Sequence, residues 1–131
     1  MVVSAPVGPY SPWRRAGDWV ILSGQIGLVA GAPAATLIEG GAAAQLRQAL
    51  TNATALLEEA GTSLEAVVKS TLYLVDMSDF AACNEVWMET FSPPRPTRSA
   101  VAVAQLPLGA LTEAELWAYA PSAKSLPTPN L

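Results

Sequence analysis

The strongest constraint on the fold of this 131-residue chain is a change of hydrophobic period along it. Between Ala42 and Ala60 apolar residues recur every three or four positions, the spacing of a helix that buries one face, and Gly61 follows as a stop signal. The set is Leu46, Ala49, Leu50, Ala53, Leu56, Leu57 and Ala60. One long amphipathic helix is therefore predicted, and the other elements have to pack around it.

Shorter segments on both sides of this helix carry strand patterns. The expected strands are 13–16, 19–26, 67–75, 99–106 and 111–120. A second helix is predicted over 79–91, where Asp76 or Ser78 can cap its start and Pro93 and Pro94 follow its end. The resulting order is ββαβαββ. The economical packing for this order is an α+β fold with two helices on one face of a mostly antiparallel sheet.

The balance of residue types predicts a single domain that associates with copies of itself. Hydrophobic residues make up 51% of the chain and charged residues only 14%, which is sparse for a small monomer. The sheet face without helices is expected to be closed by identical subunits arranged in a ring. Residues 1–120 form the expected domain, and residues 121–131 are a proline-rich tail that either frays or docks on a neighbour.

Several function classes are disfavoured by what the sequence lacks. There is no histidine and only one cysteine, Cys83, so imidazole bases, histidine-ligated metals and intramolecular disulfides are excluded. The net charge is −4 and there is no basic run, which argues against nucleic acid as a partner. The chain has neither a leader pattern nor an apolar run of membrane-spanning length. We expect a cytoplasmic protein.

The last strand places carboxylates beside aromatic side chains. Alternation puts one set of residues on the side away from the helices: Leu111, Glu113, Glu115, Trp117 and Tyr119. The other set is small or apolar and suits packing under helices: Thr112, Ala114, Leu116 and Ala118. On this pattern alone, Glu113 and Glu115 are either chemical groups of a site or solvated strand residues.

Two arginines stand among prolines in the stretch PPRPTRS (93–99). Proline restricts the backbone on both sides of it, so Arg98 enters its strand from a stiffened loop. A guanidinium matches a carboxylate through two parallel hydrogen bonds, which favours an anion-binding role for Arg98. The equal alternative is an ion pair at a subunit interface, between Arg98 and Glu113 or between Arg95 and a glutamate.

Other candidate residues carry weaker signals. Tyr10 and Asn84 are more often packing or solvated side chains than ligand contacts, and Gly24 inside a strand usually marks a bulge or a close approach. We expect Cys83 to be a small buried hydrophobe on the second helix. Lys69 could form a Schiff base, although a strand-surface charge is the commoner role.

Five motifs together resemble the RidA (YjgF) family of enamine and imine deaminases. In order, they are GPYS, VILSGQIG, VVKSTLYLVDMSDFAACNEVWMETF, RPTRSAVAVAQLP and EAEL, and the similarity covers about residues 5–120. The resemblance implies a chorismate-mutase-like fold, a homotrimer, and an active site at each subunit interface. It also implies hydrolysis of reactive 2-enamino and 2-imino acids, released by pyridoxal-phosphate enzymes, to 2-keto acids and ammonia. Neither a cofactor nor a metal is implied.

The resemblance also assigns roles to residues. Arg98 matches the arginine that holds the substrate carboxylate, and Glu113 matches the glutamate proposed to position water or move protons. Positions that line the pocket in the family correspond to Tyr10, Ser23, Gly24 and Asn84. Ala100 matches a position that contributes backbone groups near the leaving nitrogen, and Arg95 is not a catalytic position.

Some residues depart from the family pattern, so the substrate stays open. Ala100 replaces a larger residue, GQIG replaces GQIP, and Trp13 follows GPYSP where a glutamine or small residue is usual. One alternative is a specialised catabolic deaminase for a bulkier enamine, of the aminomuconate or aminoacrylate type. Another is a non-catalytic module that binds a small carboxylate or regulates a partner enzyme. The third is a ribonuclease or translation inhibitor, which the acidic charge disfavours.

Overall fold

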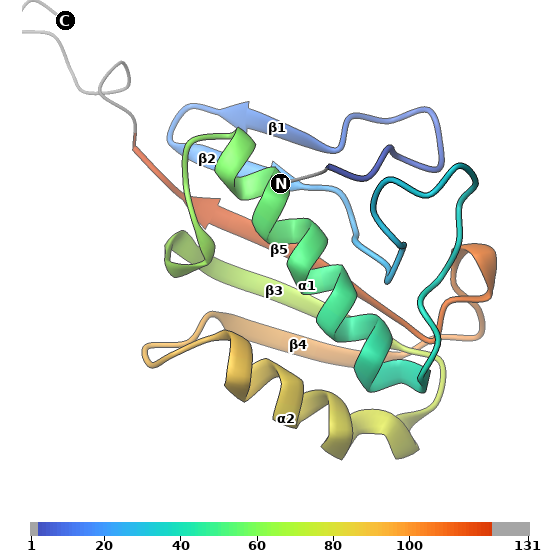
Figure 1. Cartoon of the computed structure of the whole chain (residues 1–131). Helices are drawn as coiled ribbons and strands as arrows, with labels where there is room; N and C mark the ends of the chain where they lie inside the picture. The colour runs from blue at the N-terminus through green and yellow to red at the C-terminus, as the bar shows by residue number, and fades with distance from the viewer. Residues whose placement is uncertain (1–2, 122–131) are drawn as a thin grey trace, which may run out of the picture.

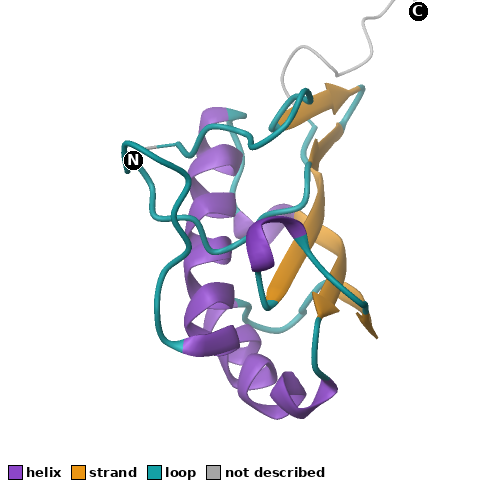
Figure 2. Cartoon of the chain, turned by 90° about the vertical axis from the view of Figure 1, so that its right-hand side faces the viewer, coloured by secondary structure: helices purple, strands orange, loops and turns teal. Residues whose placement is uncertain are grey.

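A computed structural model of the chain describes residues 3–121, which form a five-stranded sheet with two helices on one face (Figures 1 and 2). The strands are β1 (Trp13–Ala16), β2 (Trp19–Leu22), β3 (Val67–Leu74), β4 (Thr97–Ala102) and β5 (Thr112–Tyr119). The helices are α1 (Gly41–Glu59) and α2 (Phe80–Thr90), with 3-10 turns η1 (Leu64–Ala66), η2 (Met77–Asp79) and η3 (Pro107–Gly109). The predicted α+β class and the order ββαβαββ are confirmed. The predicted tail lies outside the described residues from position 122 onward.

The sheet is mixed, with strand order β1-β2-β5-β3-β4. Three of its neighbouring pairs are antiparallel, and β3 and β4 run parallel because α2 carries the chain from one to the other. The expectation of a mostly antiparallel sheet is therefore confirmed. The parallel pair leaves β4 at one edge of the sheet with α2 beside it (Figure 1).

The core lies between the sheet and the apolar face of α1. Leu46, Leu50 and Leu57 on this helix are at most 2% exposed, and they pack with side chains from the covered face of the sheet, such as Leu72 and Leu116. Gly61 follows the helix with φ +86°, a backbone conformation that favours glycine and ends the helix. The long helix predicted from spacing is thus the element that organises the core.

The second and fourth strands differ from their predicted bounds. β2 ends at Leu22 and not at residue 26, because Ser23 turns toward the N-terminal segment: its N–H donates to the Pro12 carbonyl at 2.9 Å and its hydroxyl to the Ser11 carbonyl at 2.7 Å. β4 spans Thr97–Ala102 in place of 99–106. It starts earlier because Thr97 is bonded to β3 through both its hydroxyl and its carbonyl.

The other face of the sheet carries no helix, as Figure 2 shows. Glu113, Glu115 and Trp117 of β5 lie on this face, while the residues between them are buried under the helices, so the alternation expected for this strand is confirmed. The Lys69 ammonium lies 4.8 Å from the centre of the Trp117 ring. That position makes Lys69 a strand-surface cation stacked on an aromatic ring.

Candidate active site

Arg98 lies on the helix-covered side of β4. In the parallel register it stands opposite Ser70, and Ala100 stands opposite Leu72. Ser70 and Leu72 are buried beneath the helices, so Arg98 and Ala100 share the face that looks toward α2. Because β4 is an edge strand, this side chain is held at the rim of the molecule and not in its centre.

Three side chains of α2 hold the Arg98 guanidinium. Its Nη2 donates to Asn84 Oδ1 at 2.8 Å, and its central carbon lies 5.5 Å from the Phe80 ring centre and 5.1 Å from the Trp87 ring centre. Phe80, Asn84 and Trp87 are spaced by four and three residues, so one face of the helix presents all of them to β4. Within residues 3–121 Arg98 makes no ion pair. Its remaining N–H groups are available to an anion.

Burial shapes the acid–base properties around this arginine. Burial lowers the pKa of Arg98 from its ordinary value, since desolvation disfavours the cation. The neighbouring Cys83 is fully buried, and burial, followed by the negative charge of Asp79, raises the pKa of its thiol to about 11. Cys83 is thus a protonated, packed side chain at neutral pH, in agreement with its predicted role as a small hydrophobe.

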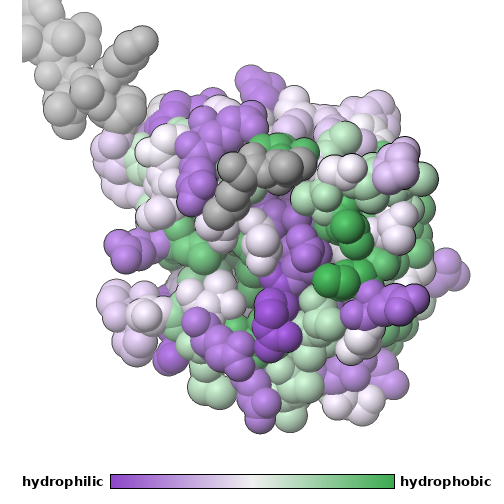
Figure 3. Space-filling view, in the orientation of Figure 1, coloured by the Kyte–Doolittle hydropathy of each residue, from purple (hydrophilic) through white to green (hydrophobic). Residues whose placement is uncertain are grey.

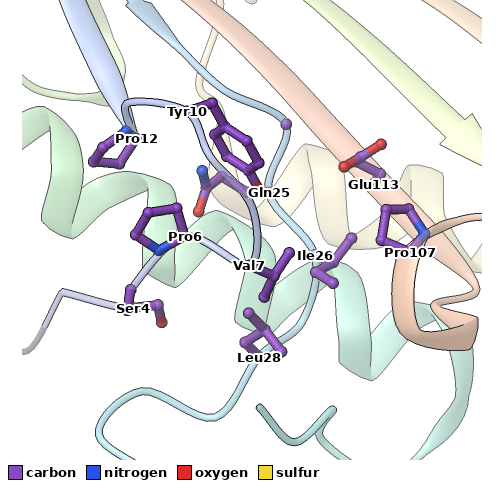
Figure 4. Close-up of a pocket in the computed structure, with 12 residues that line it drawn as sticks. Ser4, Pro6, Val7, Tyr10, Pro12, Gln25, Ile26, Leu28, Pro107 and Glu113 are labelled. Atoms are coloured by element: carbon purple, nitrogen blue, oxygen red, sulfur yellow. The ribbon is translucent and has the colours of Figure 1, made fainter.

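Glu113 lies in a separate recess, between β5, the N-terminal segment and the chain that follows β2. Figure 4 shows Glu113 and Pro107 at one end of this recess and Ser4 and Pro6 at the other. Its cavity volume is about 30 Å³, room for one or two water molecules. Tyr10, Gly24 and Gln25 also line it.

Gly24 allows the backbone to come close to the glutamate. A Cβ atom at this position would lie 2.7 Å from Glu113 Oε2, closer than such atoms approach one another. The approach is set by Gln25, which exchanges two backbone hydrogen bonds with Ala114, at 2.7 and 2.9 Å. The glycine therefore serves close packing over the carboxylate, one of the two roles expected for it.

Two buried amides of α1 fix the segments that form the recess. Asn52 Nδ2 donates to the Leu28 carbonyl at 2.9 Å, and Gln45 Oε1 accepts from the Leu111 N–H at 2.8 Å. Both side chains are buried, so these bonds replace water that the amides have lost. One helix thereby positions both the chain that carries Gly24 and the start of the strand that carries Glu113.

The surroundings of the Glu113 carboxyl raise its pKa. Burial raises its pKa above the ordinary value, and the like charge of Glu115, two residues away on the same face, raises the pKa further. Within residues 3–121 the carboxylate accepts no hydrogen bond that would oppose this shift.

The structure divides the predicted site residues between two places. Arg98, Asn84 and Ala100 lie together beside α2, whereas Tyr10, Gly24 and Glu113 line the recess. Glu113 is on the uncovered face of the sheet and Arg98 on the covered face, so no ion pair joins them within one chain. The alternative of an Arg98–Glu113 ion pair between two subunits stays a prediction, since a single chain does not test it.

Two other predicted residues, Ser23 and Arg95, donate hydrogen bonds to backbone carbonyls of the same chain. The Ser23 hydroxyl is bonded to the Ser11 carbonyl and does not line the recess. Arg95 Nε donates to the Phe91 carbonyl at 2.8 Å, which holds the loop before β4 to the end of α2. Phe80 and Trp87 were not predicted as partners of Arg98. Their spacing around Asn84 on one helical face is the signal that could have found them.

The described part of the chain was compared with two simple patterns, a metal-ligand cluster and a membrane-spanning helix. Among residues 3–121 no three His, Cys, Asp or Glu side chains are grouped as metal ligands would be. In the same residues, neither helix is both long and apolar enough to span a bilayer.

Comparison with known proteins decides the family. A sequence model of the family described as Endoribonuclease L-PSP matches residues 2–120. The chain belongs to this family, also called RidA or YjgF. A RutC family protein of Pyrococcus horikoshii is 44% identical over 114 residues, which cover 87% of this chain and 89% of that protein. The mouse protein named 2-iminobutanoate/2-iminopropanoate deaminase is 38% identical, over 85% of this chain and 81% of its own.

Solved structures of RidA-type proteins share the fold. The crystal structure of RidA from an Antarctic Psychrobacter has a TM-score of 0.83 and 43% identity, covering 89% of this chain and 93% of that one. Escherichia coli TdcF, crystallised with bound serine, has a TM-score of 0.81 and 32% identity, covering 89% and 92%. A structure from Thermotoga maritima titled as a putative endoribonuclease matches with a TM-score of 0.83 and 36% identity, covering 92% and 93%.

Proposed function

We propose that this RidA family member is a hydrolytic deaminase that converts 2-imino and 2-enamino acids to 2-keto acids and ammonia. The observation that carries the proposal is Arg98, a guanidinium held by aromatic rings and one amide with no carboxylate partner in the described chain. Relatives named 2-iminobutanoate/2-iminopropanoate deaminase, 38–39% identical, support the reaction class.

The chemistry suits the residues at hand. Arg98 holds the substrate carboxylate through two N–H donors and so fixes the position of the C=N carbon. Glu113 takes a proton from a water molecule, whose oxygen adds to that carbon while the nitrogen gains a proton. In the resulting carbinolamine the hydroxyl group gives up its proton, the nitrogen takes one up and the C–N bond breaks, so that the 2-keto acid and ammonia are released. Each turnover consumes one water, and the raised pKa of Glu113 brings its proton affinity nearer to neutral pH.

Arg98 and Glu113 lie on opposite faces of the sheet, so one chain does not bring both to the same substrate. Because Arg98 and Glu113 lie on different faces of one sheet, a small substrate bound to Arg98 does not reach Glu113 of the same chain. We propose that a second copy supplies the glutamate, in a homotrimer whose subunit interfaces each hold one site. The helix-free sheet face, with its aromatic side chains, supports an assembly of this kind.

The endoribonuclease named in the family description is the weaker candidate. Phosphate-backbone binding depends on clustered Lys and Arg, whereas this chain has 7 basic and 11 acidic residues. The one exposed arginine on α1, Arg47, is paired with Glu89 at 3.2 Å. We therefore place the anion-binding role on Arg98 alone.

The decisive experiment measures the loss of 2-iminopropionate, generated in situ from alanine by an amino-acid oxidase and trapped with semicarbazide. Wild type should accelerate the loss, and Arg98→Ala should reduce kcat/KM by about 30-fold or more, since a desolvated charge-assisted contact is worth roughly 2 to 5 kcal/mol. Arg47→Ala is the matched control and should keep wild-type rates. Gel filtration checks that the assembly persists. Wild type that adds nothing to the spontaneous rate would refute the proposal.

A further inference from the structure

The recess at Glu113 adjoins a larger depression. The depression has a cavity volume of about 370 Å³, against about 30 Å³ for the recess. The two share part of their lining: Ser4, Ala5, Pro6, Val7 and Leu28. The recess holds little more than water, so the body of a substrate has to lie outside it, and the depression is the adjoining space of ligand size.

Most of the side chains that line the depression are apolar. No charged side chain lines it, and Ser4 supplies its only side-chain hydroxyl. Val7, Val29 and Leu108 line it with 40–54% of their surface exposed, although large apolar side chains are usually buried. Figure 3 shows strongly hydrophobic residues at the surface in the right-hand half of the view, where Figure 1 has the loop between β2 and α1. A hydrocarbon group suits this lining, and a second carboxylate does not.

Leu108 adds an independent indication of a binding role. It is the only non-glycine residue in the described chain with a positive φ, which is 59°. Leu108 lies in the turn η3 and directly follows Pro107, which lines the recess together with Glu113. Left-handed backbone disfavours a side chain such as leucine, and strain of this kind collects at ligand sites. Here the strained backbone presents an apolar side chain to solvent at the rim of the depression, which no packing need of the core explains.

We propose that the preferred substrates are 2-imino acids with an aliphatic side chain of four or more carbons, which lies against Leu108 and Val29 in the depression. This inference rests on the proposed deaminase function. The reacting carbon sits at the mouth of the Glu113 recess, and the hydrocarbon chain extends past Val7 and Leu28, the wall that the two cavities share.

The expected preference is large enough to measure. Each methylene removed from water favours binding roughly three- to fourfold. The imino acid formed from leucine has three more side-chain carbons than the one formed from alanine. With part of that chain left exposed, we expect kcat/KM for the leucine-derived substrate to exceed that for the alanine-derived one by about tenfold or more.

The test compares both substrates, generated by an amino-acid oxidase and trapped with semicarbazide, on wild type, Leu108→Ala and Met88→Ala. Alanine keeps the strained backbone of Leu108 and removes only the apolar side chain. Met88, also an exposed apolar residue (55%), lies on α2 away from the depression and is the matched control. Leu108→Ala should lower the ratio of kcat/KM for the leucine-derived substrate to kcat/KM for the alanine-derived one at least threefold, and Met88→Ala should keep both values at those of wild type. Val29→Ser is the second variant if Leu108→Ala unfolds at a lower temperature.

Calorimetry of the two products, pyruvate and 4-methyl-2-oxopentanoate, gives a readout that does not need turnover. Tighter binding of the longer acid, weakened in Leu108→Ala, supports the subsite even if neither imino acid is hydrolysed, an outcome that would refute the deaminase function alone. If wild type has equal kcat/KM for the two imino acids and equal affinity for the two keto acids, the inference is overturned and the proposed function stands. A ratio that survives Leu108→Ala and Val29→Ser overturns it as well.

Discussion

Arg98 shows how a cation can be oriented without a counter-ion. Two ring faces and one amide oxygen limit the guanidinium to a narrow range of positions while leaving donors free. An acidic partner would hold it as firmly but would compete with an anionic substrate. The aromatic contacts therefore orient the side chain at little cost in anion affinity.

Phe80 is expected to position Arg98 without touching the chemistry. Phe80→Leu removes the ring face but keeps an apolar side chain, and the loss of a cation–π contact of about 0.5 to 2 kcal/mol should raise KM roughly 2- to 30-fold with kcat little changed. Steady-state kinetics on 2-iminopropionate measures this split. Phe80→Tyr restores a ring and should restore KM. Equal falls in kcat for both variants would contradict the positioning role.

Glu115 is expected to tune the pH dependence of the reaction. Glu113 acts as a base only when ionised, so activity falls as pH drops through its pKa, which burial and Glu115 hold above the ordinary value. Glu115→Gln removes the like charge, lowers the pKa of Glu113 and moves the acid limb of kcat/KM to lower pH. Burial remains, so the limb stays above the position of an exposed glutamate. Glu65→Gln, in η1, is the control; a limb that does not move in Glu115→Gln would show that another group titrates.

The placement of a single residue could be predicted from sequence where a local pattern indicated it. The side of β5 that carries Glu113 followed from period-2 spacing, and the burial of Cys83 followed from the usual role of a lone cysteine on a helix. The aromatic partners of Arg98, Phe80 and Trp87, were not predicted, because they belong to a helix earlier in the chain whose orientation depends on packing. The Ser23 hydroxyl looked available, yet it is bonded to a carbonyl twelve residues away.

At the scale of elements, the segment between β2 and α1 is held between a helix and a strand. A Cβ on Gly27 would lie 2.6 Å from the Gln45 carbonyl oxygen of α1, whereas one on Gly24 would meet the end of the Glu113 side chain. Backbone in a packed helix cannot move aside, but a carboxylate can. The two glycines are therefore needed for different reasons, the first for folding and the second for the recess.

Substitution of these glycines should separate stability from activity. Gly27→Ala forces the segment off α1 and should lower the free energy of unfolding by about 1 to 3 kcal/mol, measured by urea denaturation. Gly24→Ala should cost little stability but displace Glu113 and reduce kcat. If Gly24→Ala kept full activity, the close approach of backbone to carboxylate would have no catalytic part.

The wrong bound for β2 comes from the same segment. Residues 19–26 carry a continuous strand pattern, but Ser23 pairs with the N-terminal segment and Gln25 pairs again with β5 at a single bridge. Such a break depends on partners distant in sequence, which propensity does not register. The two helices, by contrast, were predicted within two residues because their spacing and stop signals are local.

For the whole molecule, the proposed division of the site between copies gives a test by mixing. Arg98→Ala and Glu113→Gln should each be inactive alone. After joint unfolding and refolding at equal amounts, random trimers should regain about a quarter of wild-type activity, since a site is intact when each neighbour contributes its unaltered residue. Each variant refolded alone is the control. No recovery in trimers shown to be mixed would mean that one chain supplies both groups.

The overall architecture could be predicted because it depends on order and period rather than on detail. The ββαβαββ order and the two faces of β5 follow from where apolar residues recur, and packing rules then allow few arrangements. The separation of Arg98 from Glu113 could not be predicted in this way. It depends on which side of an edge strand faces α2, and that is settled by the parallel register of β3 and β4.

The four tryptophans of this chain stand in distinct surroundings. Trp87 touches the guanidinium of Arg98, Trp19 and Trp117 lie edge to face on the uncovered side of the sheet, and Trp13 donates to Glu59 on the opposite side. Their emission will respond to different events. Fluorescence from Trp87 should change with the proposed anion binding at Arg98, and that from Trp19 and Trp117 with the proposed subunit contact on the sheet. Single-tryptophan variants would therefore follow each of the two events in real time.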